Sequence, residues 1–574
     1  MGDPGQVYVN SKGLQQHQFD AIVVGSGISG GWAAKELCEK GLKTLVIERG
    51  RNVVHVKDYP TAMMAPWEFP HGLINTLADK KENPVSSQHY DPGNKSFFVS
   101  DRDHPYIQDD PFHWVRGYQV GGRSLTWGRQ CYRLSDLDFE ANLKDGHGVD
   151  WPIRYKDLEP WYAYVEEFTG ISGKAEGLSQ LPDGNFLPAI EMNCIEDYFS
   201  KKISANYKDR LLTPARVANL SKGWKDRGPC QFRNLCSRGC PYGGYFSSNS
   251  ATLPAAVATG NLFVLYDAVV AEVIYDEKKN RASGVRVIDS ITRESTEYFA
   301  KIIFLNASTI DTASILLRSV SSRYPHGLGN DSGQVGHNLM DHFIGAGASG
   351  DFEGLSDQYY YGRKPAGIYM PRFRNLHNEN ADKNYVRGWG YQAIGERKNW
   401  DEQGSELRGF GKKFKENLLK PGPWTIWMGG WGETLPYYDN GISLDGQQKD
   451  EWGLPIVRIH FTYGDNEKEM RKDIQISAVE MLEKSGFTSI NDFNYNLPPG
   501  SAIHEMGTVR MGRDPETSVL NGHNQMHGIK NIFITDGSCM TSSACQNPSL
   551  TYMALTARAC DFAVNEWKKG SIKN

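Results

Sequence analysis

The sequence predicts an α/β fold with a parallel, nucleotide-binding sheet and a second region of antiparallel strands. Three observations support this prediction. Residues 19–47 have the pattern of a strand, a glycine-rich turn, a helix and a second strand. Apolar segments typical of buried strands return at residues 301–306 and 531–536. Between residues 346 and 495 the chain becomes rich in aromatic and turn residues, a pattern typical of antiparallel strands.

The first unit carries a motif for a dinucleotide. Strand 19–24 leads into Gly25-Ser26-Gly27-Ile28-Ser29-Gly30, whose glycines permit a tight turn and whose helix start offers free N–H groups to a pyrophosphate. Strand 44–47 ends at Glu48, where a carboxylate can accept ribose hydroxyls. An ordinary glycine-rich turn is the alternative, and the motif alone does not choose between FAD and NAD. A nicotinamide-linked dehydrogenase therefore stays open at this point.

The following segments extend the sheet and cover it. Residues 52–115 show little regular pattern and predict long surface loops that roof a site. Residues 262–288 alternate as a β-meander, and strand 301–306 leads into a helix-like segment near residues 312–318. The chain ends with a helix-like run at residues 549–567. The nucleotide-binding domain is therefore predicted to be discontinuous.

Composition excludes several classes of protein. With 574 residues, 39% of them hydrophobic and 23% charged, the chain predicts more than one folded core and is neither disordered nor fibrous. The formal charge of -5 gives no basic surplus for nucleic acid. We find no apolar run long enough to cross a bilayer, and the first twenty residues lack the features of a secretory signal. We therefore expect no membrane span and no export signal of the chain's own.

Five motifs in a fixed order carry a resemblance to a known family. The first is Arg116-Gly117-Tyr118-Gln119-Val120-Gly121-Gly122-Arg123-Ser124, and roughly 400 residues later comes His504-Glu505-Met506-Gly507-Thr508-Val509-Arg510-Met511-Gly512. Residues 336–342, 536–538 and 547–551 supply the others. Together they resemble the glucose-methanol-choline (GMC) family of flavin oxidoreductases over most of the chain. The resemblance implies an α/β fold, in which a Rossmann-like FAD-binding domain is joined to a discontinuous α+β substrate domain built on an antiparallel sheet.

On this basis we assign the domains. The FAD-binding domain is expected at residues 1–140, 216–345 and 496–574. The substrate domain, with its cap region, is expected at residues 141–215 and 346–495. The second FAD-binding part contains a cysteine-rich loop, and the third contains the candidate catalytic residues.

The resemblance and the glycine motif imply a set of cofactor contacts. The expected FAD-binding residues are Gly25, Ser26, Gly27, Gly30, Glu48, Arg49, Arg116, Gly121, Gly122, Ser124, Val270, Asp536 and Asn547. Some family members tether the flavin through a histidine in the segment that here contains Trp127. This chain has no histidine between Ser124 and Tyr132, so we expect non-covalent FAD.

The chemistry of the family requires a base for the hydroxyl proton while a hydride leaves the same carbon. A neutral imidazole suits this role, and His504 occupies the family's position. Asn547 stands where relatives have His or Asn, and its amide can hold the substrate oxygen. We predict a His504/Asn547 pair. The alternatives are a buried structural histidine and, for Asn547, a turn residue before Pro548; His342 is expected to be structural, outside the catalytic set.

A cysteine loop suggests a second redox centre. Residues 230–241 contain Cys230, Cys236 and Cys240, and the last is followed by proline as in many iron-sulfur loops. The loop resembles that of bacterial flavin-dependent sugar dehydrogenases whose catalytic subunit carries a [3Fe-4S] cluster and passes electrons to a cytochrome. We predict these three cysteines as cluster ligands. A structural zinc site with a fourth ligand, or three unligated thiols, are the alternatives.

Taken together, these features predict an FAD-dependent dehydrogenase of a sugar, sugar acid or glycoside. The resemblance is closest to bacterial glucoside 3-dehydrogenases, which implies oxidation of a glucoside C3 hydroxyl to a 3-keto-glucoside in carbohydrate metabolism. Electrons would leave through the cluster to a non-oxygen acceptor. An oxygen-using sugar or alcohol oxidase of the same family, and a non-catalytic electron-transfer flavoprotein subunit, are the alternatives.

Partners and compartment follow only from the resemblance. It implies a small carrier subunit that bears an export signal and a cytochrome c that accepts electrons. The expected compartment is the periplasm by such carriage, or the cytoplasm. Several aromatic residues of the expected substrate domain could stack on a sugar ring or fill a core: Trp424, Trp427, Trp431, Tyr437 and Tyr438.

Overall fold

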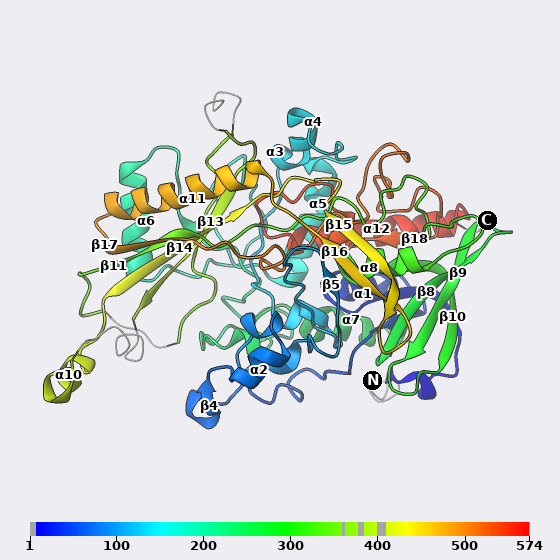
Figure 1. The fold of residues 1–574 in the computed structure, drawn as a ribbon, viewed down its shortest axis with the longest axis horizontal. Helices are drawn as coiled ribbons and strands as arrows, with labels where there is room; N and C mark the ends of the chain where they lie inside the picture. Colours follow the sequence, from blue (N-terminus) through cyan, green and yellow to red (C-terminus); the bar gives the residue numbers. More distant parts are fainter. Residues whose placement is uncertain (1–6, 359–361, 377–383, 399–408, 573–574) are drawn as a thin grey trace.

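The molecule has two large sheets in opposite halves (Figure 1). The computed structural model describes residues 7–358, 362–376, 384–398 and 409–572. The rest of the expected substrate segment 346–495, namely residues 359–361, 377–383 and 399–408, lies outside the described residues. The α/β class and the antiparallel second sheet are confirmed, whereas the domain boundaries stay predictions.

The first sheet has the strand order β1-β7-β3-β2-β10-β9-β8, with β18 beside β10. Its members are β1 (Tyr8–Val9), β2 (Gln18–Val24), β3 (Thr44–Ile47), β7 (Leu262–Leu265), β8 (Ala268–Asp276), β9 (Arg281–Asp289), β10 (Ser295–Leu305) and β18 (Ile532–Ile534). Strands β1, β7, β3, β2 and β10 pair in parallel in that order, and β18 pairs in parallel with β10. All four residues of β3 are buried. Apolar residues along a whole strand are expected where both faces of a sheet are covered.

Strand β10 joins the two kinds of pairing. Its first half, Ser295–Phe299, pairs antiparallel with β9, while Ile303–Leu305 pair in parallel with β18 on the same side. Its other side pairs in parallel with β2. The carboxyl ends of β2, β10 and β18 therefore meet at one edge of the sheet. Ligands of open α/β sheets bind at this edge.

Helices cover the first sheet on both faces. The set consists of α1 (Ile28–Glu39), α5 (Tyr155–Thr169), α7 (Leu253–Ala258), α8 (Thr309–Arg318) and α12 (Ser549–Lys569). Helix α1 packs against α12, and α12 packs against α5. Neighbouring residues of β2 point to opposite faces of the sheet. Val23 belongs to a buried cluster with several residues of α1, and Val24 belongs to the cluster with residues of α8.

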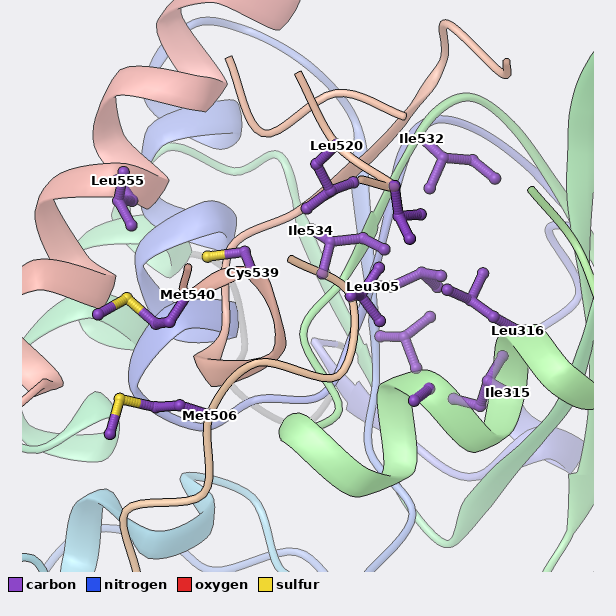
Figure 2. Close-up of a cluster of buried hydrophobic side chains, with 14 of the residues drawn as sticks. Leu305, Ile315, Leu316, Met506, Leu520, Ile532, Ile534, Cys539, Met540 and Leu555 are labelled. Carbon is purple, nitrogen blue, oxygen red and sulfur yellow. The ribbon is translucent and has the colours of Figure 1, made fainter. Parts of the chain in front are cut away.

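The core on the α8 face extends toward the chain's last motifs. Figure 2 shows Leu305 and Ile534, from adjacent parallel strands, near Ile315 of α8. Met506 belongs to the same buried cluster and lies two residues after His504. Burying one such side chain contributes about 1.5–3 kcal/mol. The loop that carries His504 is therefore anchored in the core on its C-terminal side.

The second sheet is six-stranded and antiparallel throughout, in the order β17-β11-β14-β13-β12-β6. Its strands are β6 (Thr213–Pro214), β11 (Ala346–Phe352), β12 (Ile368–Met370), β13 (Trp389–Arg397), β14 (Trp424–Gly432) and β17 (Thr488–Asn494). Helices α6 (Cys194–Asn206) and α11 (Asp465–Lys484) pack on one face and bury residues such as Ile474 and Met481. On the opposite face, Gln392 of β13 donates a hydrogen bond to Asn547.

Two features of this half differ from the sequence prediction. Two strands of the expected antiparallel region, β15 (Gly441–Lys449) and β16 (Pro455–His460), do not join the six-stranded sheet and make a separate sheet with β5 (Ile107–Gln108). Helix α11 lies in a segment expected to contain strands. Its buried apolar residues Met470, Ile474 and Ala478 repeat every four residues, but the many charged residues between them make this helical period hard to recognise in the sequence.

The remaining regular elements are short: β4 (Pro70–Leu73), α2 (Leu77–Glu82), α3 (Asp136–Phe139), α4 (Ala141–Asp145) and α10 (Gly411–Leu418). Residues 52–115 contain no helix longer than α2 within the described structure, as the weak sequence pattern predicted. In the described ranges we find no helix with the length and apolar character needed to span a bilayer.

Candidate active site

A cavity of about 380 Å³ lies at the carboxyl edge of the parallel strands. Most of the predicted cofactor and catalytic residues line it: Gly25, Ser26, Gly27, Glu48, Arg49, Arg116, Gly122, Ser124, Val270, His504, Asp536 and Asn547. Gly30 and Gly121 lie behind this lining. The cavity thus brings together segments that are up to about 500 residues apart in the sequence.

The glycine-rich turn shapes one end of the cavity. Gly25 has φ +93°, and a Cβ there would collide with the carbonyl oxygen of Asn306. Gly30 packs so closely that a Cβ would meet the carbonyl of Gly25. A Cβ on Gly27 would meet no atom within 4 Å, and one on Gly122 would lie 3.2 Å from the Gly27 Cα. Two backbone segments therefore flank an open space at the start of α1, where a phosphate is favoured.

Glu48 lies at the end of β3, on the wall of this space. Its carboxyl accepts hydrogen bonds from the Ser26 hydroxyl and N–H and from the Gly50 N–H at 3.1 Å. Burial raises the pKa of Glu48 to about 7, although these donors favour the carboxylate. Its oxygens keep lone pairs for further donors, as ribose hydroxyls would be.

Two arginines of the cavity wall are held by aromatic rings. The Arg49 guanidinium lies 4.4 Å from the ring centre of Tyr118 and 4.8 Å from that of Trp452. Arg116 donates to the His104 carbonyl at 2.8 Å and lies 4.2 Å from the Trp114 ring. Such stacking restricts the conformations that an arginine side chain can adopt and so fixes the position of its guanidinium group.

The residues present fit FAD. Three polar atoms of the cavity wall are buried without a hydrogen-bond partner among the described residues: Asn306 Nδ2, Tyr552 Oη and Arg49 Nε. A buried polar group without a partner costs about 1–3 kcal/mol, so these atoms favour a polar ligand. Asp536, by contrast, is fixed by the Ser308 N–H and the Thr312 hydroxyl. Open space for a phosphate, an acid at the strand end and unpaired donors together match a flavin dinucleotide.

Five residues form a directed hydrogen-bond series at the inner end of the cavity. Gln392 Nε2 donates to Asn547 Oδ1 at 2.8 Å, and Asn547 Nδ2 lies 3.4 Å from His504 Nε2. His504 Nδ1 lies 2.8 Å from His342 Nδ1. His342 Nε2 lies 2.8 Å from the carbonyl oxygen of Ala544.

The end of this series determines where the protons are. The Ala544 carbonyl can only accept, so His342 Nε2 carries a proton and its Nδ1 accepts in the neutral ring. His504 Nδ1 must then donate to His342, which leaves a lone pair on His504 Nε2. That lone pair faces Asn547 and the cavity. The geometry thus prepares His504 Nε2 to accept a proton.

The backbone of the His504 loop is held by one carboxyl group. Asp341 is fully buried and accepts hydrogen bonds from the N–H groups of Gly500, Ala502 and His504, at 2.9, 3.3 and 2.9 Å. Burial, and then Glu505, raise the pKa of Asp341 to about 8, while the three N–H groups oppose this. Ile503 is held at φ +61°, a conformation that β-branched residues rarely adopt. Asp341 therefore fixes a strained backbone next to the candidate base.

The electrostatic surroundings keep both imidazoles neutral. Burial lowers the pKa of His342 to about 4. The pKa of His504 is lowered well below its usual range by burial, then by His342 and by Arg123. Arg123 is itself paired with Glu505 at 2.9 Å. At neutral pH the His504 ring is therefore an unprotonated base.

Sequence reasoning missed part of this arrangement. Gln392 lies on β13, and nothing in the local sequence distinguishes it from other strand residues. His342 was placed outside the catalytic set as a structural residue, yet it contacts the ring of the candidate base. The motif at residues 336–342 contains both Asp341 and His342 and could have pointed to them. It does not show that both contact the loop that carries His504.

The cysteine loop adjoins the cavity on another side. A second cavity of about 20 Å³ is bordered by all three predicted ligands, Cys230, Cys236 and Cys240. The N–H groups of Phe232 and Gly244 donate to the sulfur atoms of Cys230 and Cys240, at 3.4 and 3.3 Å. Ser237 of the same loop lines the large cavity. Among the described residues, no group of three His, Cys, Asp or Glu side chains is arranged so that it could hold a metal ion.

Comparison with known proteins identifies the family of the chain. Residues 19–344 match the N-terminal part of the GMC oxidoreductase family, and residues 436–556 match its C-terminal part. The chain is 28% identical over 579 residues to 2-methyl-1,2-propanediol dehydrogenase of Mycolicibacterium austroafricanum, covering 95% of each protein. It is 26% identical over 569 residues to the fructose dehydrogenase large subunit of Gluconobacter japonicus, covering 96% of this chain and 98% of that protein.

Solved structures share the fold. Pyridoxine 4-oxidase from Mesorbium loti matches with a TM-score of 0.61 and 17% identity, covering 95% of this chain and 99% of that one. The fold and site define a flavin-dependent alcohol oxidoreductase. The chain belongs to the GMC oxidoreductase family, and it is an FAD-dependent enzyme that acts on CH–OH groups.

His342→Phe should slow substrate-driven flavin reduction by about tenfold to a hundredfold, because His504 Nδ1 loses its acceptor and the ring is free to turn or change tautomer. Anaerobic stopped-flow absorbance measures this rate. His337→Phe, in the same motif but half-buried and stacked on Tyr438, is the matched control and should keep the wild-type rate. Equal rates in the two variants would contradict the role of His342.

The pH dependence of flavin reduction follows from the lowered pKa of His504. The base must be unprotonated, so the rate should stay constant as pH falls through the usual imidazole range and decline only below it. In His342→Phe the decline should move to higher pH, because one cause of the lowered pKa is gone. Stopped-flow rates between about pH 5 and 8 test this. A wild-type midpoint at or above about 6.5 would contradict it.

Proposed function

We propose that this enzyme is a dehydrogenase that oxidises a ring hydroxyl of a sugar or glycoside, with the C3 hydroxyl of a glucoside as the favoured position. One observation carries the proposal: the lone pair of His504 Nε2 and the amide of Asn547 face the same end of the cofactor cavity. The glucoside preference rests on the motif resemblance. The fructose dehydrogenase large subunit, similar over nearly its full length, supports a sugar substrate.

The chain's own residues account for the proton chemistry. FAD, when bound, supplies the acceptor for the hydride of the alcohol carbon. The hydroxyl of a bound alcohol replaces the 3.4 Å Asn547 contact at the His504 Nε2 lone pair, which then takes the hydroxyl proton, while an N–H of the Asn547 amide can hold the same oxygen. Loss of the hydride from the carbon and of the proton from its oxygen leaves a carbonyl group, so the product of a secondary alcohol is a ketone. Gln392 and His342 hold the two groups in orientation.

We further propose that the cavity holds FAD without a covalent tether. Trp127 lines the cavity where some relatives have a histidine, and its indole N–H donates to the Phe246 carbonyl at 2.9 Å. An indole nitrogen engaged in this way offers no nucleophile for a covalent bond. The fixed Glu48 and Asp536 carboxyls support tight non-covalent binding.

Electrons would leave through a [3Fe-4S] cluster held by Cys230, Cys236 and Cys240. The proposal is supported by three thiols that border one small cavity, with N–H groups donating to two of them, as in iron-sulfur loops, although in this structure the three described side chains are not arranged to hold a metal ion. Ser237 places the loop against the cofactor cavity, which supports a short path between the two centres. Reception of electrons by a cytochrome c, and carriage to the periplasm by a small subunit, belong to the same proposal.

His504→Ala should leave the flavin absorbance of the purified protein unchanged and slow its anaerobic bleaching by glycosides by about a hundredfold or more. The experiment mixes wild type and variant with methyl glucosides, sugars and simple diols, and identifies products by NMR. A 3-keto-glucoside from wild type is the expected product. Bleaching by diols alone would contradict the sugar assignment, and normal bleaching in the variant would remove His504 as the base.

Cys236→Ser should leave flavin reduction by substrate intact while slowing electron delivery to a cytochrome c by about tenfold or more, because only the exit route is damaged. Cys194→Ser, a thiol outside the loop on α6, is the matched control. Iron and sulfide analysis of both proteins accompanies the kinetics. Wild-type protein without iron, or with rapid peroxide formation in air, would favour the oxidase alternative.

A further inference from the structure

One face of the six-stranded sheet is continuous with the catalytic residues. The register of its strands places five residues in a row across that face: Tyr369, Gln392, Gly429, Gly347 and Phe493. Gln392 of this row donates to Asn547. From Gln392, which lies beside the catalytic pair, the row therefore runs outward to the edge strand β17.

Aromatic rings cover the two glycines of the row. A Cβ on Gly429 would lie 2.5 Å from the Trp427 ring, and one on Gly347 would lie 2.8 Å from the Phe493 ring. The Trp427 and Phe493 planes are parallel within 7°, with centres 5.8 Å apart. Tyr495 continues the series, 5.5 Å from Phe493 and within 10° of its plane. We name Trp427, Phe493 and Tyr495 the aromatic floor.

Two of the three rings of the aromatic floor are exposed to solvent. Trp427 is 39% exposed and Tyr495 63% exposed, whereas Trp424 on the same strand is 1% exposed beneath the helices. Trp427 alternates with Trp424 along β14, so it points to the face away from α11. Phe493 is 8% exposed and stacked against both neighbours, so Trp427 and Tyr495 are the rings of the floor on which a ring of a ligand could stack.

The distance along the row sets the size of that ligand. Neighbouring strands lie roughly 4.8 Å apart, so the three strand spacings from Gln392 to Phe493 amount to roughly 14 Å. A single hexose at Asn547 is too short to reach across them, and a two-ring molecule is long enough. In the neighbouring row Trp427 lies between Ile394 and Ser349, and Asn491 follows Ser349, so that polar groups are present on one side of Trp427.

We propose that the aromatic floor is a subsite for the aglycone of a glycoside substrate, whose sugar ring is oxidised at His504 and Asn547. The ligand class is a glycoside with a planar or apolar ring beyond the glycosidic oxygen. This inference rests on the proposed function and adds a specificity determinant to it. The floor's rings bring no charge and few donors, which suits an apolar ring better than a second polyhydroxyl one.

The test compares phenyl and methyl glucosides, in both anomers, as substrates of the flavin-loaded enzyme. Wild type should have a higher kcat/KM for the phenyl glucoside. Trp427→Ala should lower that value by about fivefold to tenfold, chiefly through KM, and leave the methyl glucoside within about twofold. Trp427→Phe, which keeps a flat ring, should restore most of the preference.

Control variants separate a subsite from a structural role. Trp67→Ala removes a tryptophan that is 84% exposed in another part of the molecule, and it should change neither substrate. An unchanged phenyl-to-methyl ratio in Trp427→Ala, or an equal loss on both substrates, would overturn the subsite. Wild-type flavin that no glucoside bleaches but a simple diol does would instead contradict the proposed function, and the subsite would fall with it.

Discussion

The Asp341–His342 pair holds the candidate base from two sides, and the rest of the site depends on it. Asp341 binds the backbone of the loop at residues 500–504, and His342 binds the ring of His504. Both side chains are fully buried, so moving the loop would leave a buried carboxyl or imidazole without a partner. The position of His504 in turn determines where Asn547 can donate and where an alcohol can lie between them.

The two sheets supply different halves of this arrangement. The carboxyl edge of the parallel sheet forms the cofactor cavity, and the antiparallel sheet brings Gln392 to Asn547. Because protein interiors are close-packed, a shift of the second sheet is transmitted through Gln392 to the catalytic amide. Helix α11 matters here, since it packs on β11, β14 and β17 and fixes the plane of that sheet. Stability of the substrate half and orientation of the site are therefore linked.

Local patterns predicted what depends on local chemistry. The Gly25 turn and the acid at the end of β3 could be predicted from the sequence. A tight turn needs glycine, and the residue that follows a parallel strand lies at the edge of the sheet where ligands bind. Long-range register had no such signal. Gln392 is 155 residues from Asn547, and β15 and β16 form a separate sheet in which β16 pairs with β5, a strand only two residues long. The numerous charges of α11 concealed its helical period. The cysteine loop was found from its spacing, and its ligand role stays a prediction.

The donors from Gln392 to the Ala544 carbonyl all point the same way, and this polarity has a consequence for the end of a turnover. A proton that reaches His504 Nε2 removes the lone pair that faced Asn547, so two N–H groups then oppose each other. The amide cannot turn over freely, because its oxygen is held by Gln392. Arrival of the proton therefore breaks the contact between the amide and the ring, and Nε2 must lose that proton before the pair can serve the next alcohol.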